Sequence, residues 1–304
     1  MFSNTLRVCT LSSIVLLAIA GAGERPEKSA DKTLTARLAK TGLYVISGGG
    51  GNSLLRLSAN GFILVDGKLA GNYDAILALT KKLSYSDQPI RALILTGHYL
   101  DRTGNNAEFL KGGTAILAHQ NLAHNLSAKV TPPTMTYDRE YTLRLGGVEA
   151  RLMHFGKART NGDTVVYFPN LKVVAVGDLL APTPDPDYSA GGSLVGWGPA
   201  LAQVLKLDFD GVVPSKGQPV TRAGLEAFKT KVDTLVARAT ELVKQGVPKD
   251  QLMAKLKTDD LGWRLSFTPD QVDGFYDELF ENKAPTDEAR SERRDASRLS
   301  TNIR

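Results

Sequence analysis

The sequence predicts an α/β fold in which two β-sheets pack face to face and helices cover their outer surfaces. Short apolar runs bounded by Gly, Pro and Asn recur between residues 42 and 214, as expected for β-strands. Segments with helical spacing of apolar residues lie between some of these runs. The second half continues the alternation without a periodic sequence repeat. Two packed sheets with outer helices fit this order better than one doubly wound parallel sheet.

The first half of the domain predicts a strand hairpin, a helix and then further strands. Asn60-Gly61 is a two-residue hairpin signal between two apolar runs. Residues 74–83 place their apolar side chains on one side of a helix. The expected strands are 43–46, 53–57, 62–65, 90–95, 115–117, 141–145, 148–153, 164–168 and 173–176.

Three helices are expected at the C-terminal end of the domain. The first, residues 221–245, is long and amphipathic, begins with Thr221 as its N-cap and ends before a glycine. Two shorter helices are expected at 250–257 and 269–280. Beyond them the composition changes to charged and small side chains, so residues 283–304 are expected to be a disordered tail.

The composition excludes several classes of protein. With 42% hydrophobic and 23% charged residues the chain builds a core, and with one Cys it is no disulfide scaffold. Its formal net charge of +5 is spread along the chain, so nucleic acid is not an expected partner. Only four His accompany the single Cys, so a metal site of imidazoles and thiolates has few residues to draw on.

The first 22 residues have the features of a secretory signal peptide. Arg7 precedes an apolar run at 8–20 that ends in small residues. This run is short for a bilayer span, so no stable membrane insertion is expected after cleavage; a retained anchor is the alternative. Cleavage removes Cys9, which suits an oxidising compartment, and we expect a periplasmic or secreted protein. The signal peptide, linker, domain and tail are expected at 1–22, 23–41, 42–282 and 283–304.

Four ordered segments at predicted strand ends carry a family resemblance. Residues 95–106 read Leu-Thr-Gly-His-Tyr-Leu-Asp-Arg-Thr-Gly-Asn-Asn, and residues 156–164 read Gly-Lys-Ala-Arg-Thr-Asn-Gly-Asp-Thr. A Gly-Asp strand end follows at 176–179, and Val-Pro-Ser-Lys-Gly at 213–217. In this order they resemble the motifs of metallo-β-lactamase fold hydrolases: Thr-His-x-His-x-Asp-His-x-Gly-Gly-Asn, Gly-x-Ala-His-Thr-x-Gly-Asp, Gly-Asp and Val-Pro-Gly-His-Gly. The resemblance implies a four-layered αββα metallo-β-lactamase-like sandwich with C-terminal helices.

In the family that the chain resembles, the His and Asp side chains of these motifs hold one or two zinc ions that generate a hydroxide nucleophile. The resemblance places Asp101 and Asp178 at the two aspartate positions. The five histidine positions are all substituted, by Gly97, Tyr99, Arg102, Arg159 and Lys216. Two carboxylates without imidazoles bind zinc poorly, and neighbouring cations repel a divalent ion. No metal is therefore expected, although zinc is the cofactor of the resembling family.

The four histidines do not restore the ligand set. His98 lies between two substituted positions, and a shift that makes it a ligand worsens every other match in the motif. It is expected to be exposed or to lie behind the site. His119 and His124 are expected on the surface, and His154 either faces the cleft or serves in packing and hydrogen bonding.

The substitutions introduce three cations beside the two retained carboxylates. Our hypothesis is that Arg102, Arg159 and Lys216 occupy the space of the ions and pair with Asp101 and Asp178, which keeps these carboxylates ionised without metal. Two zinc ions with two aspartates and a hydroxide carry the same formal charge as three cations with two aspartates. The alternative is neutral decay, with the cations pointing into solvent.

Three further features lie near the expected cleft. The glycine run at 48–51 precedes a strand rather than a helix, so a flexible hairpin rim is favoured over a phosphate-binding loop. Tyr99 is expected to fill the vacated imidazole volume, with ligation or base catalysis as alternatives. Residues 182–199 form a Pro- and Gly-rich loop in which Tyr188 and Trp197 either line a pocket or hold the loop together.

The sequence therefore predicts an exported pseudoenzyme or ligand-binding homologue of the zinc hydrolases. Arg159 and Lys216 suit a small anionic ligand, such as a carboxylate or a phosphate. One competing prediction is an active hydrolase, and another is a structural or interaction protein with partner contacts on its C-terminal helices and tail. The hydrolase would use an unconventional metal site or a metal-free mechanism. Its candidate residues are Asp101 and Asp178 with His98 or His154 for the metal, and Tyr99 or Lys216 for the metal-free mechanism.

Overall fold

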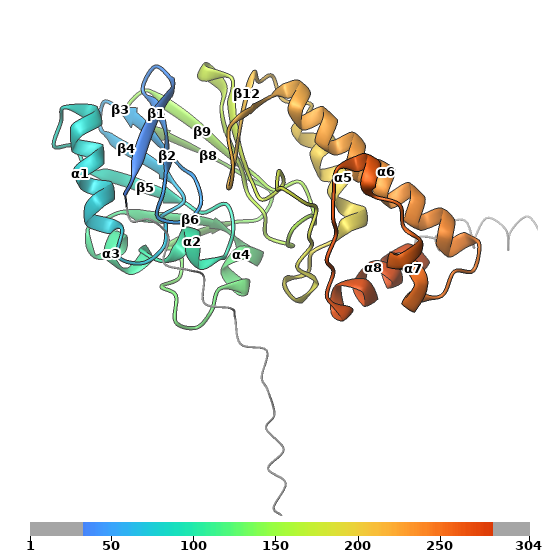
Figure 1. Cartoon of the computed structure of the whole chain (residues 1–304). Helices are drawn as coiled ribbons and strands as arrows, with labels where there is room; N and C mark the ends of the chain where they lie inside the picture. Colours follow the sequence, from blue (N-terminus) through green and yellow to red (C-terminus); the bar gives the residue numbers. More distant parts are fainter. Residues whose placement is uncertain (1–32, 282–304) are drawn as a thin grey trace, which may run out of the picture. The chain divides into compact units, whose positions relative to one another are not determined.

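The computed structural model describes residues 33–281, so the expected signal peptide and the expected tail lie outside the described residues. The described chain contains two mixed β-sheets, in agreement with the predicted fold class (Figure 1). The first sheet has seven strands that follow one another in chain order. They are β1 (Thr35–Lys40), β2 (Leu43–Ser47), β3 (Ser53–Ser58), β4 (Gly61–Val65), β5 (Ile90–Ile94), β6 (Ala115–His119) and β7 (Met135–Tyr137).

The second sheet has six strands in the order β13-β12-β11-β10-β9-β8. Neighbouring strands are antiparallel except for the parallel pair of β11 and β12. In the first sheet, β4 to β7 are parallel to one another. The strands of the second sheet are β8 (Glu140–Leu145), β9 (Val148–Met153), β10 (Val165–Phe168), β11 (Val173–Gly177), β12 (Gly211–Pro214) and β13 (Val220–Thr221).

Eight α-helices occur among the described residues. Thr221 caps the longest of them, α6, because its side chain accepts a hydrogen bond from the Gly224 N–H. None of the described helices combines the length and the apolar character that a bilayer crossing requires. The helices are α1 (Tyr73–Ser84), α2 (Leu100–Thr103), α3 (Asn106–Lys111), α4 (Gln120–Asn125), α5 (Leu194–Val204), α6 (Arg222–Lys244), α7 (Lys249–Lys255) and α8 (Pro269–Glu281).

Three apolar cores separate four layers. Side chains alternate along a strand, so Ile63 and Val65 of β4 enter a core between the two sheets, whereas Phe62 and Leu64 enter a core beneath the first set of helices. That outer core includes Ile76 of α1 and residues of α3 and α4. The third core lies between the second sheet and α5 to α8. This arrangement is the predicted αββα sandwich with C-terminal helices.

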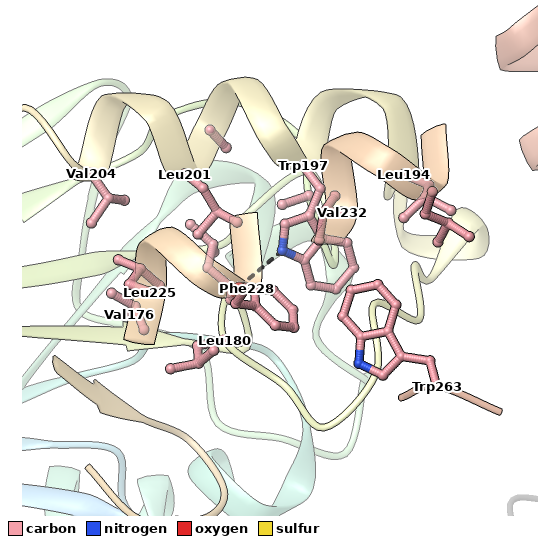
Figure 2. Close-up of a cluster of buried hydrophobic side chains, with 14 of the residues drawn as sticks. Val176, Leu180, Leu194, Trp197, Leu201, Val204, Leu225, Phe228, Val232 and Trp263 are labelled. Atoms are coloured by element: carbon pink, nitrogen blue, oxygen red, sulfur yellow. Dashed lines mark hydrogen bonds between the residues drawn. The ribbon is translucent and has the colours of Figure 1, made fainter. Parts of the chain in front are cut away.

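The third core corrects the expectation of a loop from 182 to 199 (Figure 2). Helix α5 already begins at Leu194, and Trp197 on this helix is fully buried rather than lining a pocket. Its indole Nε1 donates a hydrogen bond to the Leu179 carbonyl over 2.9 Å. The Gly and Pro content of this segment indicates a loop, but burial of its apolar side chains stabilises a helix instead.

The start of the domain also differs from the expected boundary at residue 42. Residues 35–40, which were expected to be part of a linker, form β1 and pair antiparallel with β2. This strand lies at the edge of the sheet, and Leu38 remains 56% exposed. An edge strand that buries few side chains has no clear apolar alternation, which is why the sequence did not indicate it.

Candidate functional site

The family-like segments come together in space. Asp101 and Arg102 lie on the short helix α2 just after β5, whereas Asp178 directly follows β11 and Lys216 follows β12. The Arg102 side chain reaches Asp178, and the Lys216 ammonium lies 3.3 Å from Asp101 Oδ2. Side chains from both sheets therefore form one cluster at the ends of these strands.

Arg102 is the centre of this cluster and is only 1% exposed. Its Nη1 donates a hydrogen bond to Asp101 Oδ1 over 2.9 Å, and its Nη2 donates to Asp178 Oδ1. Its Nε lies 3.8 Å from Asp66 Oδ2. One guanidinium thus joins the two carboxylates that remain from the family motif, as the hypothesis of compensating cations predicts for this residue.

Gly97 leaves the space through which the Arg102 side chain passes. A Cβ atom built at Gly97 would lie 3.5 Å from both Cδ and Nε of Arg102 and 3.6 Å from Cζ. A methyl group at this position would be in ordinary van der Waals contact with Arg102, so a larger side chain such as imidazole has little room beside the guanidinium. The loss of the first family histidine and the gain of Arg102 are sterically linked.

Burial and neighbouring charges act in opposite directions on the pKa values of this cluster. Burial alone lowers the pKa of Arg102, but the carboxylates of Asp178 and Asp101 raise it above its ordinary value. Burial alone raises the pKa of Asp178, but Arg102 and the Ser215 hydroxyl hold it below its usual range. Arg102 and Asp178 are therefore both charged at neutral pH.

Arg159 pairs with neither Asp101 nor Asp178, so the hypothesis of compensating cations is wrong for this residue. Its Nη1 lies 2.9 Å from Asp185 Oδ2, and its Nε donates a hydrogen bond to the Tyr99 hydroxyl over 3.1 Å. The Tyr99 hydroxyl in turn donates to Asp187 Oδ2 over 3.0 Å. The loop after Asp178 thus supplies Asp185 to Arg159 and Asp187 to Tyr99. The sequence did not indicate that this loop would reach Arg159.

Tyr99 contacts two guanidinium groups, because the Cζ atoms of Arg102 and Arg159 each lie 5.4 Å from its ring centre. Cations over an aromatic face are attracted by the ring. Burial raises the pKa of Tyr99 even though Arg159 opposes this shift. A hydroxyl that is harder to ionise is a poor general base, so the geometry favours Tyr99 as a packing and hydrogen-bonding residue.

Two buried carboxylates belong to the site although the sequence did not single them out. Asp66, at the end of β4, accepts hydrogen bonds from the N–H (2.8 Å) and hydroxyl (2.6 Å) of Thr96. Asp163 accepts hydrogen bonds from Thr160 in the same way. Burial raises the pKa of Asp66 to about 6 and that of Asp163 to about 7. The charge balance inferred from the motif alone therefore omitted two carboxylates, Asp66 and Asp163.

Lys68 is a further buried cation that the sequence did not indicate. Its ammonium is fully buried and donates hydrogen bonds to the carbonyls of Ile46 and Gly51. Burial lowers the pKa of Lys68 to about 8, although Asp66 and Asp101 oppose this shift. From the sequence, a lysine in a turn after a strand is expected on the surface. Only the folded structure shows that Lys68 is buried and hydrogen-bonded to backbone carbonyls.

The glycine run lies directly against the cluster, which agrees with the expected position near the cleft. A Cβ atom at Gly50 would lie 3.1 Å from the Asp101 Cβ. The Asn52 side chain donates hydrogen bonds to the carbonyls of Pro214 (3.0 Å) and Gly217 (2.8 Å). Together with Lys68, these contacts fasten the run over Asp101 and beside the Lys216 loop.

The histidines lie around the cluster rather than in it. His98 Nε2 is 4.0 Å from Asp187 Oδ2, at the rim of the site. His124 is exposed, as predicted, but His119 is buried, which corrects its expected surface position. The imidazoles of His119 and His154 stack with their centres 4.0 Å apart, and His154 Nδ1 lies 2.9 Å from the Asp163 carbonyl oxygen. His154 thus serves in packing and hydrogen bonding.

The residues present do not fit a zinc ion at the family's position. In residues 33–281, no three His, Cys, Asp or Glu side chains are grouped so that they could hold a metal ion. The guanidinium of Arg102 lies between the two aspartates, where it takes up carboxylate oxygens that a zinc ion would need. We therefore derive no chemical step that passes through a metal.

Comparison with known proteins assigns the family. The Metallo-beta-lactamase superfamily model matches residues 46–216, which is more than half of the chain. The chain belongs to this superfamily. The resemblance inferred from the four motifs is thereby confirmed.

Two solved structures with less than 20% sequence identity to this chain share its fold. One is a metallo-beta-lactamase from Pontibacter korlensis, with 18% identity, a TM-score of 0.59, and coverage of 66% of this chain and 99% of that chain. Another is the metallo-beta-lactamase FIM-1 from Pseudomonas aeruginosa in its mono-zinc form, with 19% identity, a TM-score of 0.56, and coverage of 66% and 95%. The second of these relatives is thus a zinc protein.

A curated relative is 2,4-dinitroanisole O-demethylase subunit alpha from Nocardioides sp. (strain JS1661). The two sequences are 28% identical over 168 residues, which cover 54% of this chain and 51% of that protein. The chain thus spans about half the length of this relative.

Proposed function

We propose that this protein is a metal-independent member of the metallo-β-lactamase superfamily, a pseudoenzyme or ligand-binding homologue in which side-chain cations replace zinc. The observation that carries this proposal is the Arg102 guanidinium between Asp101 and Asp178. The guanidinium supplies positive charge and hydrogen-bond donors to two carboxylates that a zinc ion would otherwise bind. Gly97 supports the proposal because it leaves room for this side chain.

Metal analysis of protein purified without chelators tests the proposal. We expect less than about one tenth of an equivalent of zinc, iron and manganese together after growth with these metals. Stoichiometric metal would refute it. A variant with all five family histidines (Gly97→His, Tyr99→His, Arg102→His, Arg159→His and Lys216→His) is the positive control, because it restores the imidazoles of the family's zinc site. If this variant folds and still binds no zinc, the assignment of the ligand positions is wrong.

We also propose that the protein is exported by cleavage of residues 1–22. The proposal rests on the basic residue and apolar run at the N-terminus. Mass determination of the mature protein and cell fractionation test it. We expect a chain that begins near residue 23 in the periplasm or the medium. A chain that retains its first 22 residues in the membrane fraction would instead indicate an anchor.

The demethylase relative favours a second candidate function, that of an enzyme. The substitution of all five family histidines would require this enzyme to work without zinc. Lys216 would be its reactive group in preference to Tyr99, because Lys216 is half exposed whereas the pKa of Tyr99 is raised by burial. To test this function, the protein is incubated with 2,4-dinitroanisole and a chelator, and the loss of 2,4-dinitroanisole is measured by chromatography. Turnover that Lys216→Met abolishes would favour the enzyme over the ligand-binding protein.

A further inference from the structure

A second set of ion pairs lies at the rim of the cluster and comes from one loop. Between β11 and α5, this loop carries Asp185 and Asp187. The Arg159 Nη1 donates to the Asp185 carbonyl oxygen and also lies 2.9 Å from Asp185 Oδ2. The loop therefore places one of its own carboxylates on the guanidinium of Arg159.

We propose that Arg159 is a binding site for the carboxylate group of a small external molecule, and that Asp185 of the chain itself takes this place in the present structure. This inference rests on the proposed ligand-binding function and names its ligand class. Arginine binds a carboxylate through two parallel N–H donors, and its planar shape makes it selective for this group.

The pair of Arg159 and Asp185 is weak enough for such a replacement. The side chains are 24% and 41% exposed, so water and salt screen their attraction. Partly exposed pairs of this kind contribute little to stability. By contrast, Arg102 and Asp101 are 2% and 3% exposed, and an external anion cannot reach them. Only the rim guanidinium can exchange its partner.

The structure also provides space for the remainder of a ligand. A hollow of about 380 Å³ lies beside Arg159 and is walled by hydroxyl, amide and aromatic side chains as well as carboxylates. Gln271 on α8 donates hydrogen bonds to Asp185 Oδ1 and to the Pro186 carbonyl, and thus holds the loop from the far side. Asp185 Oδ2 can therefore leave Arg159 while the loop stays attached to α8.

The charges around the hollow select a ligand with one negative charge. Asp187 and Asp270 also line it, and they repel an anion that approaches Arg159. The Ser189 hydroxyl and the Tyr99 hydroxyl both donate to Asp187, and these bonds lower the pKa of Asp187, which therefore stays ionised. A doubly charged phosphate suffers this repulsion more than a carboxylate does. Of the anionic ligands expected from the sequence, a monocarboxylate therefore fits this hollow best.

Titration with acetate, acetamide and inorganic phosphate tests the proposal, with the Arg159 Nε–H resonance as the signal. We expect Asp185→Asn to bind acetate about fivefold more tightly than the unchanged protein, because its weakly paired carboxylate no longer competes. Acetamide has the same shape without charge and should bind to neither protein. Asp185→Asn retains an oxygen that can accept the hydrogen bond from Gln271, so the loop should keep its attachment.

Two further variants make the result decisive, with binding followed by the line shifts of neighbouring backbone amides. Arg159→Gln added to Asp185→Asn should abolish saturable acetate binding. Asp74→Asn removes an exposed charge from α1, outside the hollow, and should change acetate affinity by less than about twofold. An equal gain in Asp74→Asn, a larger gain for phosphate than for acetate, or no saturable binding in Asp185→Asn would each overturn the proposal. Metal analysis of the same samples keeps this result separate from the metal-independent function.

Discussion

The two sets of ion pairs at this site use the same side-chain chemistry but differ in burial. Arg102 and its aspartate partners are enclosed by α2, the glycine run and the Ser215 loop, and Arg102 is 1% exposed. Arg159 meets Asp185 at the rim, where both side chains reach solvent. A buried charge without its partner is very unfavourable, whereas an exposed one is solvated by water. The inner set therefore fixes the structure of the site, and the rim set is free to exchange partners.

Loss of the inner cation should produce the largest effect. Arg102→Met keeps most of the side-chain volume but leaves the buried Asp178 without its ion-pair partner and Asp101 with Lys216 alone, so we expect a loss of about 3–5 kcal/mol in the free energy of unfolding. Urea unfolding measures this loss. Arg264→Met, at an exposed position, is the matched control and should stay within about 0.5 kcal/mol of the unchanged protein. Equal effects of both substitutions would show that the inner pairs contribute nothing special.

The pH dependence of stability should reveal Asp66. Burial raises its pKa to about 6 in the folded protein from an ordinary value of 3.8, so the folded state holds this proton more firmly than the unfolded chain does. The contribution of Asp66 to stability is therefore greatest below pH 4 and falls as the pH rises to about 6, by up to about 3 kcal/mol. Above this range the contribution is constant.

Asp66→Asn should remove this part of the pH dependence. The difference in unfolding free energy between the unchanged protein and Asp66→Asn should change between pH 4 and 6.5 and stay constant from 7 to 8. Urea unfolding at each pH measures it. The exposed Asp74→Asn serves as the control, and its curve should run parallel to that of the unchanged protein. A parallel curve for Asp66→Asn as well would contradict the raised pKa.

Substitutions of Gly97 should show whether Arg102 occupies the space of the first family histidine or whether that histidine was simply lost. Gly97→Ala places its methyl group 3.5 Å from Arg102, an ordinary van der Waals contact, and should be nearly neutral. Gly97→His directs a ring into the guanidinium and should cost about 1–3 kcal/mol through overpacking. Thermal unfolding of both variants checks this order. If Gly97→His proves as stable as Gly97→Ala, Arg102 does not occupy the space of the first family histidine.

The rim should give the smallest effect on stability. Arg159→Met removes a partly exposed pair and should cost about 1 kcal/mol or less. Raising the salt concentration should reduce this cost further, whereas the cost of Arg102→Met should barely change, because salt screens exposed charges much more than buried ones. Urea unfolding at low and high ionic strength compares the two. A cost for Arg159→Met close to that of Arg102→Met would remove the distinction between inner and rim pairs.

Much of the fold could be predicted because its signals are local. Residues 74–83 and 221–245 show helical spacing, and the helices α1 and α6 lie at these positions. The strands β4 and β5 are short apolar runs next to clear turn signals. By contrast, β1 and α5 were missed. In β1 the side chains stay exposed, and in α5 the helix depends on burial of Trp197 rather than on its Gly- and Pro-containing sequence.

The candidate site divides in the same way. The motif spacing alone identified Asp101, Arg102 and Asp178, because family positions are fixed by their order along the chain. Asp66, Lys68 and Asp185 carried no such signal, because each acts through contacts with residues that are distant in the sequence. The same limit explains why Arg159 was assigned to the wrong carboxylates.

The sequence by itself determined the superfamily, the four-layered order of elements, and the replacement of every family histidine. These properties follow from local apolar patterns and from the residue types at fixed motif positions. Only the tertiary structure decided which cation meets which carboxylate and how deeply each pair is buried. The physical reason is that Coulomb attraction and desolvation depend on distance and solvent exposure, and the folded chain sets both.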